Sequence, residues 1–256
     1  MGASPRFFQD WLAHEAPFAD CPDLSCFAEV DGAREVIDSA LQSLVVDHLI
    51  GIDQLARLVG RPAALKAAAQ RVPTSRRQMS GDFGEILAAV FVEECTDFRL
   101  PVRRLRYKAD REFPMQGDDI VALELNQPPR LLKGEAKSRR VLDTATVQAA
   151  NKALNSGDGR PKPETLGFLS SVLRDREEDD LAELVEAFLD DFDDAQVEHL
   201  LFTVSGNDRR DLLEQHANSE RPAIQRRVTG VVIDDHRDFI SAVFKSVREA
   251  IVAGDE

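Results

Sequence analysis

Residues 118–137 read DDIVALELNQPPRLLKGEAK, and this stretch decides the fold. Two runs rich in β-compatible residues, 119–125 and 131–137, flank the turn-forming segment NQPPR. Proline and asparagine between two apolar runs are typical of a connection that reverses the chain. The pattern therefore predicts a β-hairpin.

Acidic side chains and a lysine converge on one face of this hairpin. Glu135 and Lys137 are two residues apart in one strand, so they project from the same face. With the turn centred on Pro128, Asp119 lies on that face diagonally from Glu135, roughly 7–8 Å away between backbones. A register shifted by two residues would place Asp119 directly opposite Glu135. Asp118 would face the other side, so Asp119 is the preferred partner.

A helix before the hairpin supplies a third carboxylate. Capping side chains at 80–82 precede an apolar stripe that continues at helical spacing to Cys95, and Glu85 lies one turn into this helix. Magnesium takes oxygen ligands, typically one or two carboxylates with water and substrate phosphate in the other positions. A nearby lysine can stabilise developing negative charge. The set predicts phosphodiester hydrolysis with Mg²⁺ or Mn²⁺.

Each element alone also has a structural interpretation. Glu-x-Lys strings arise by chance in highly charged chains, and adjacent aspartates after a glycine often form a turn. Glu85 near a helix N-terminus can complement the helix dipole. The ordered set, on a helix and two paired strands, favours catalysis because the groups lie on rigid elements.

The rest of the chain alternates helical and extended patterns, which indicates an α/β fold. Pro73-Thr74-Ser75 marks a boundary between a helical region at 1–75 and an α/β domain at 76–256. Further helices are expected at 35–49, 63–70, 144–154, 179–189 and 237–252, and further strands at 101–107, 166–172, 199–204 and 228–233.

Charge is distributed unevenly. The net charge of −14 argues against a protein that coats nucleic acid by bulk electrostatics. Residues 99–140 nevertheless carry eleven Lys or Arg against six Asp or Glu, whereas 175–198 carry one against twelve. A basic face on the first segment could still meet a polyanion.

Other functional classes find little support. No apolar run approaches the roughly 20 residues of a membrane span, and no signal peptide is recognisable. Three cysteines make no plausible disulfide framework, so we expect a soluble, cytoplasmic protein without a membrane partner. No phosphate-binding Gly-x-x-x-x-Gly-Lys-Ser/Thr motif is present, so ATP hydrolysis would have to come from another protein.

Four short motifs give the chain a family resemblance. They are GDFGE at 81–85, RYK at 106–108, QGDD at 116–119 and KGEAK at 133–137. The arrangement resembles the PD-(D/E)xK nuclease superfamily and, more narrowly, the HamA nuclease subunits of the Hachiman anti-phage defence system. The resemblance covers roughly residues 80–151. It implies a restriction-endonuclease-like core, a mixed sheet flanked by helices, with the N-terminal helical region added.

The resemblance also implies roles for individual residues. Asp119, Glu135 and Glu85 would be metal ligands and Lys137 the catalytic lysine. Gln148 lies where related nucleases often place a supporting glutamine. The second aspartate of Gly117-Asp118-Asp119 stands where an apolar residue is expected, which leaves the choice between Asp118 and Asp119 open.

The implied activity is that of a metal-dependent DNA nuclease working with a large helicase subunit, which would hold the DNA. Candidate phosphate contacts are basic residues near the motifs: Arg104, Arg106, Lys108, Arg139 and Arg140. These residues could instead pair with acidic side chains. Two other functions stay open: a non-catalytic DNA-binding or adaptor subunit with a nuclease-like fold, and a stand-alone restriction-type endonuclease.

Overall fold

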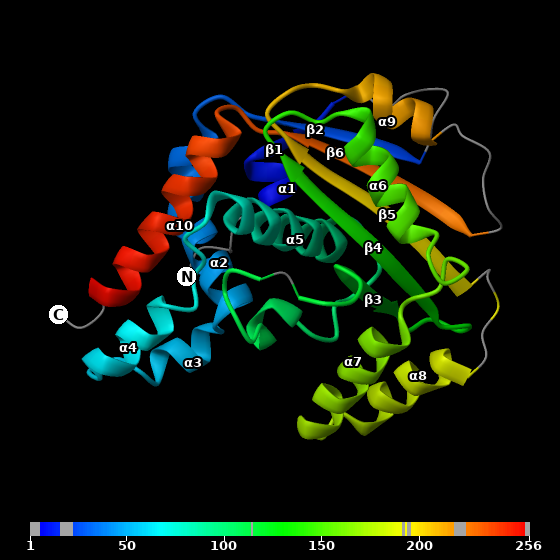
Figure 1. Ribbon diagram of the computed structural model, residues 1–256, viewed down its shortest axis with the longest axis horizontal. Helices are drawn as coiled ribbons and strands as arrows, with labels where there is room; N and C mark the ends of the chain where they lie inside the picture. Colours follow the sequence, from blue (N-terminus) through cyan, green and yellow to red (C-terminus); the bar gives the residue numbers. More distant parts are fainter. Residues whose placement is uncertain are drawn as a thin grey trace.

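The computed structural model describes residues 6–15, 23–113, 115–190, 193, 196–217 and 224–253. Within these residues, the strands form a six-stranded mixed sheet in the order β1-β2-β6-β5-β4-β3 (Figure 1). The strands are β1 Leu12–His14, β2 Leu24–Glu29, β3 Ile120–Glu124, β4 Arg130–Arg139, β5 Val197–Ser205 and β6 Gln225–Val232. The central pairings β2–β6, β6–β5 and β5–β4 are parallel, and the edge pairings β1–β2 and β3–β4 are antiparallel.

Helices cover both faces of the sheet. They are α1 Phe7–Asp10, α2 Ala33–Leu49, α3 Ile52–Ala56, α4 Pro62–Ala69, α5 Arg76–Cys95, α6 Thr144–Leu154, α7 Pro163–Asp175, α8 Asp179–Asp190, α9 Arg210–Ala217 and α10 His236–Ala253, with a 3₁₀ helix, η1, at Arg104–Tyr107. On one face α5 packs on β3, β4 and β5, and α10 packs against α2, α4 and α5. On the other face α6 lies on β4 and β5, and α9 on β6 and β2.

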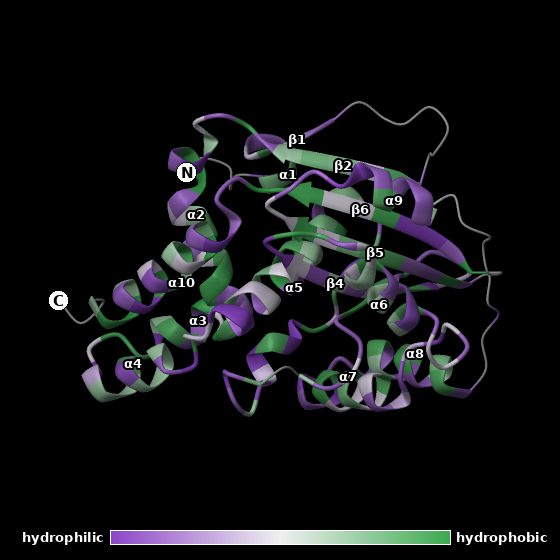
Figure 2. Cartoon of the chain, turned by 45° about the horizontal axis from the view of Figure 1, so that its top comes forward, coloured by the Kyte–Doolittle hydropathy of each residue, from purple (hydrophilic) through white to green (hydrophobic). Residues whose placement is uncertain are grey.

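The polarity of the elements matches these layers. Figure 2 shows helices such as α2 and α10 with alternating hydrophilic and hydrophobic stretches, as expected of helices that bury one side. β5 is buried along its whole length because it lies in the middle of the sheet with helices on both faces. α7 and α8 pack on each other beside the β3–β4 end of the sheet (Figure 1).

The α/β class and most of the expected elements are confirmed. The helices expected at 35–49, 63–70, 144–154, 179–189 and 237–252 appear as α2, α4, α6, α8 and α10, and the strands at 199–204 and 228–233 as β5 and β6. The hairpin is formed by β3 and β4. The helix that carries Glu85 begins earlier than expected, because Ser75 caps it by accepting a hydrogen bond from the Gln78 amide at 3.3 Å.

The expectation that residues 1–75 are helical is wrong for two segments, β1 and β2. β2 pairs in parallel with β6, so the first 75 residues contribute strands to the same sheet as the rest of the chain. They also share its core: the ring of Phe8 contacts those of Phe91 and Phe202, at centroid distances of 5.3 and 6.4 Å. A division at residue 75 would therefore cut through one sheet and one core.

Two expected strands are helical instead. Residues 166–172 lie in α7, where Leu166, Leu169 and Leu173 recur at helical spacing and are all buried. Residues 101–107 contain η1, and there Arg106 binds the Asp47 carboxylate on α2 at 2.7 Å. Among the described helices, none is both long and apolar enough to cross a membrane.

Candidate active site

The pairing of β3 with β4 decides which side chains meet. Ile120 lies opposite Gly134, and Leu123 lies opposite Leu131. This register differs by two residues from one centred on Pro128. Continued by one residue, it places Asp119 directly opposite Glu135, which is the second of the two arrangements considered from the sequence.

Hydrogen bonds fix the three hairpin groups in this arrangement. The Oδ2 atom of Asp119 accepts a hydrogen bond from the Ala136 amide at 3.0 Å, across the end of the hairpin. The Nζ of Lys137 donates to the Oε1 of Glu135, so these two side chains share one face of β4 as their spacing predicts. All three groups are partly buried.

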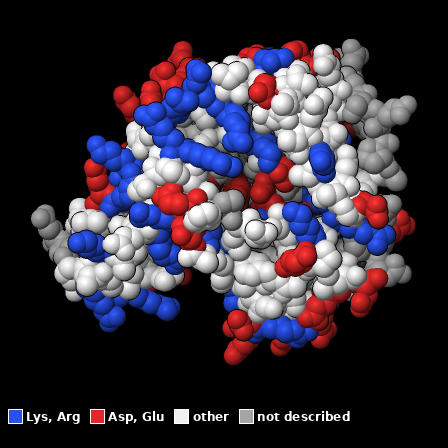
Figure 3. Space-filling model, viewed as in Figure 1, with Lys and Arg blue, Asp and Glu red and all other residues white. Residues whose placement is uncertain are grey.

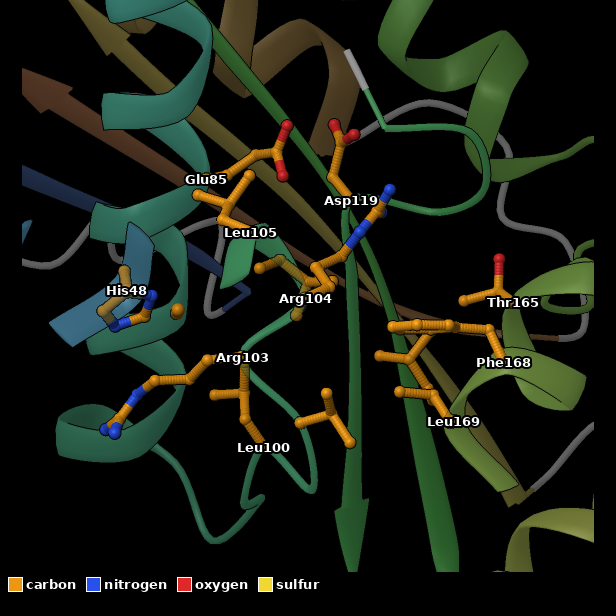
Figure 4. A pocket seen from close by; sticks show the side chains of 14 residues that line it. His48, Glu85, Leu100, Arg103, Arg104, Leu105, Asp119, Thr165, Phe168 and Leu169 are labelled. Carbon is orange, nitrogen blue, oxygen red and sulfur yellow. The ribbon is translucent and has the colours of Figure 1, made fainter. Parts of the chain in front are cut away.

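Glu85 reaches the same place from α5. The helix can lie close to β4 because position 84 is a glycine: a Cβ there would stand 2.9 Å from the Cβ of Ser138. Ser80, one turn earlier, donates a hydrogen bond to the carbonyl of Ser138 at 3.0 Å. Figure 4 shows the carboxylates of Glu85 and Asp119 near each other at one end of a pocket.

The crowding of carboxylates shifts their proton equilibria. Burial raises the pKa of Glu85 well above its ordinary value, and the charge of Asp119 raises it further. Burial also raises the pKa of Asp119, against the opposing effect of Lys137. Burial and the charge of Asp119 raise the pKa of Glu135 to about 7. Such shifts mark a site where negative charge is concentrated without a complete set of counter-charges.

Arg104 supplies one positive charge beside the acids. It lies on η1 and is buried, and its side chain extends next to Asp119 in Figure 4. One of its Nη atoms donates to the carbonyl of Gln116 at 3.0 Å, and the other, also buried, has no partner among the described residues. Its charge lowers the pKa of both Glu85 and Asp119.

The donor set suits a hard divalent cation. The Oε2 of Glu85 is buried and accepts no hydrogen bond from the described residues, so this carboxyl oxygen is available to a ligand. Among these residues no three acidic, His or Cys side chains form a ready-made metal cluster. Magnesium needs no such cage, since it is commonly held by one or two carboxylates and keeps water and phosphate oxygens. Asp119 neighbours both other acids and would be the common ligand.

Asp118 has a different environment from Asp119. Its Oδ2 accepts a hydrogen bond from the Lys162 amide at 2.7 Å, and its Oδ1 lies 3.7 Å from the Nζ of the buried Lys133. The Asp118 amide donates to the hydroxyl of Thr165. Asp118 therefore connects the hairpin to the start of α7. Both of its carboxylate oxygens already have partners in the protein, which favours Asp119 as the functional residue.

Gln148 lies on α6 and is exposed. None of the hydrogen bonds between described residues joins it to the carboxylates. Its supporting role stays a prediction.

The basic residues proposed from the sequence have two different environments. Arg106 binds Asp47, Lys108 forms a buried ion pair with Asp82, and Arg104 is buried beside the carboxylates, so these three are engaged inside the protein. Arg139 and Arg140 are exposed. Only these last two are placed to contact a phosphate in solution.

Three further arginines, Arg76, Arg77 and Arg237, line a cavity together with Arg139 and Arg140. Sequence reasoning missed them because they come from α5 and α10, far apart in the chain. The double arginine directly after the N-cap Ser75 could have indicated Arg76 and Arg77, and no such signal marks Arg237. Figure 3 shows a broad basic area bordering a recess that contains acidic side chains.

Comparison with known proteins gives one positive result. None of the curated proteins compared with the chain matches it. The sequence model of the HamA family matches residues 5–247. Because this match takes in the N-terminal strands and most of α10, it covers the whole sheet and the candidate site. The chain belongs to the HamA family.

Proposed function

We propose that this chain is a metal-dependent DNA nuclease, the effector subunit of a Hachiman defence complex that also contains a helicase. Membership of the HamA family supports the defence role. The observation that carries the nuclease activity is the position of Asp119 next to both Glu85 and Glu135, whose pKa values its charge raises, with Lys137 bound to Glu135. Three partly buried acids destabilise the fold unless a cation joins them, so their assembly favours a cation-dependent role.

Bound there, Mg²⁺ or Mn²⁺ would neutralise charge on the scissile phosphate and lower the pKa of a coordinated water. The residues that would hold it are Asp119, Glu135 and Glu85. The chain's own part is to fix these oxygens: the Ala136 amide orients Asp119, and the Gly84 contact sets the distance of α5 from β4.

Lys137 supplies the positive charge next to the reacting phosphate. Its ammonium group is held by Glu135 and is partly exposed, so it stays within reach of a phosphate oxygen. In the hydrolysis, the water loses a proton as its oxygen bonds to phosphorus, the bond from phosphorus to the leaving sugar oxygen breaks, and that oxygen takes up a proton. Lys137 stabilises the extra negative charge that the phosphate oxygens carry in the transition state.

The electrostatics favour a partnered nuclease over a stand-alone enzyme. The net charge is −14, and several arginines of the 99–140 segment are neutralised by internal carboxylates. Weak attraction for DNA is the expected result. A helicase subunit that holds the DNA would remove the need for strong binding by this chain.

The test is cleavage of supercoiled plasmid by the purified chain, with and without the helicase subunit. We expect nicking or linearisation with Mg²⁺, none in excess chelator, and none by the Lys137→Ala variant. Lys152→Ala is the matched control, because Lys152 is an exposed lysine on α6. Cleavage in chelator would contradict the metal mechanism. DNA binding without cleavage by any preparation would support the adaptor alternative instead.

A further inference from the structure

A second site lies at the end of β4, next to the carboxylates. A cavity of about 400 Å³ opens where β4 ends and where α5 and α10 begin. Five arginines line it: Arg76 and Arg77 from α5, Arg139 and Arg140 from the end of β4, and Arg237 from α10. All five are exposed, so their guanidinium groups are accessible to a ligand.

These arginines are not closely paired with carboxylates as others in the described part of the protein are, although the charge of Arg139 lowers the pKa of Asp143. Within the described part of the chain, none of the five forms an ion pair with a carboxylate. By contrast, Arg103 and Arg106 both bind Asp47. Five cations around one cavity repel one another, so an anion that enters it is strongly attracted. Figure 3 shows the resulting basic surface above the acidic recess.

The floor of the cavity is a fixed polar network. The hydroxyl of Ser138 lies 2.9 Å from that of Ser80 and 2.9 Å from the Nε2 of His236. His236 is 3% exposed, and its Nδ1 has no partner among the described residues. The Gly206 amide donates to the carbonyl of Arg140 at 3.2 Å, which fixes the backbone there. These hydrogen bonds hold the backbone that carries the arginines in place.

We propose that this cavity binds a backbone phosphate of the DNA strand, distinct from the phosphate that is cleaved. The inference rests on the proposed function and adds a substrate-binding subsite to it. Arg139 follows Glu135 by four residues in an extended strand, a separation of roughly 13 Å. One phosphate group cannot occupy both places, whereas successive phosphates of one strand can.

Arginine side chains suit this ligand because their planar groups bind phosphate oxygens in pairs. A cavity lined by arginines and hydroxyls recognises the backbone and not the bases. The subsite would therefore position any DNA sequence so that the next phosphates reach the carboxylates.

The test compares two triple variants with equal charge change. Arg77→Gln, Arg140→Gln and Arg237→Gln together remove three cavity charges. Arg57→Gln, Arg61→Gln and Lys66→Gln together remove three exposed charges around α3 and α4. Fluorescence anisotropy with a labelled duplex in chelator gives the Kd over a series of salt concentrations, and circular dichroism checks the fold of each variant.

We expect the cavity variant to bind DNA at least tenfold more weakly than the control variant. The slope of log Kd against log salt concentration should fall by about one, since one phosphate contact is lost. In cleavage assays with Mg²⁺ its KM should rise while kcat stays near the wild-type value. Equal weakening by both triple variants would overturn the proposal, and so would undetectable DNA binding by the wild-type chain at low salt.

Calorimetry with inorganic phosphate separates a DNA subsite from a site for a free anion. Phosphate binding that is lost in the cavity variant while its DNA affinity equals that of the control would overturn the DNA assignment. A different result would separate the two proposals. If the wild-type chain does not cleave DNA but the cavity variant binds DNA more weakly than the control variant does, the nuclease proposal is wrong and the phosphate subsite is supported.

Discussion

Lys108 and Asp82 form an ion pair inside the protein. The Nζ of Lys108 lies 2.9 Å from each carboxylate oxygen of Asp82, and the side chains are 6% and 0% exposed. Asp82 is on α5, one turn before Glu85, so the pair joins the segment after η1 to the helix that carries a candidate ligand. Lys108 is therefore a structural residue and not a surface contact for DNA.

Lys108→Met should destabilise the protein by about 3 kcal/mol, because it leaves the Asp82 carboxylate buried without its counter-ion. Urea unfolding followed by circular dichroism measures the change. Lys245→Met is the control, since Lys245 and Glu249 are exposed and 3.8 Å apart, and its effect should stay below about 0.5 kcal/mol. Similar decreases in the free energy of unfolding for both variants would show that the buried pair stabilises the protein no more than the exposed pair does.

The two adjacent aspartates should respond in opposite ways to the same substitution. Asp119→Asn removes one of three crowded negative charges, so stability should stay equal or rise while cleavage falls by more than about a hundredfold. Asp118→Asn removes the charge beside buried Lys133 and should lower the free energy of unfolding by about 1–3 kcal/mol. Thermal unfolding and plasmid cleavage are measured on both. A loss of cleavage confined to Asp118→Asn would reverse the assignment.

Gly134→Ala should disturb the hairpin next to Glu135. A Cβ at this position would lie 2.8 Å from the Cβ of Ile120, so the two strands must move apart. We expect a loss of about 1–3 kcal/mol in stability, together with reduced cleavage. Gly81→Ala in α5 is the control: no atom lies within 4 Å of its added Cβ, and it should gain about 0.5–1 kcal/mol. An unaffected Gly134→Ala protein would argue against this register.

Acid should weaken the fold through His199. Burial lowers the pKa of this histidine to about 4, and its Nδ1 has no partner to accept a proton from the charged ring. The unfolded chain takes up a proton near pH 6.5 and the folded chain only near pH 4, so stability is complete above pH 6.5 and falls as the pH drops between these values. At pH 5 the loss relative to pH 7 is about 2 kcal/mol.

The variant His199→Gln lacks this titration. Its stability should therefore change less between pH 7 and pH 5 than that of the wild type, as measured by denaturant unfolding at each pH. The same pH dependence in both proteins would exclude His199 as the cause.

The candidate site was largely predictable because its parts are local in sequence. Glu135 and Lys137 share a face through the geometry of any strand, and Asp119 is joined to them by one short turn. The register was harder to fix, since five polar and proline residues in a row do not show where the turn is centred. Only the pairing of β3 with β4 in the structure therefore decides between the two registers.

Elements that depend on distant neighbours were not predictable. β2 becomes a strand because β6 offers it a parallel edge, and this partner lies almost at the other end of the chain. Residues 166–172 are a short apolar run, for which strand and helix patterns overlap. The environments of the basic residues also depend on remote contacts, because Lys108 forms a buried ion pair with Asp82, whereas Arg139 forms no ion pair with a described carboxylate.

The long-range pairing of β2 with β6 has a consequence for how the protein is made. Leu24 pairs with Val228, so about 200 further residues must be synthesised after β2 before the middle of the sheet can close. The hairpin with Asp119 and Glu135 can form earlier, because its neighbours α5, α6 and β5 all precede β6 in the chain. A nascent chain therefore carries the acidic residues in an incomplete sheet until β6 has been synthesised.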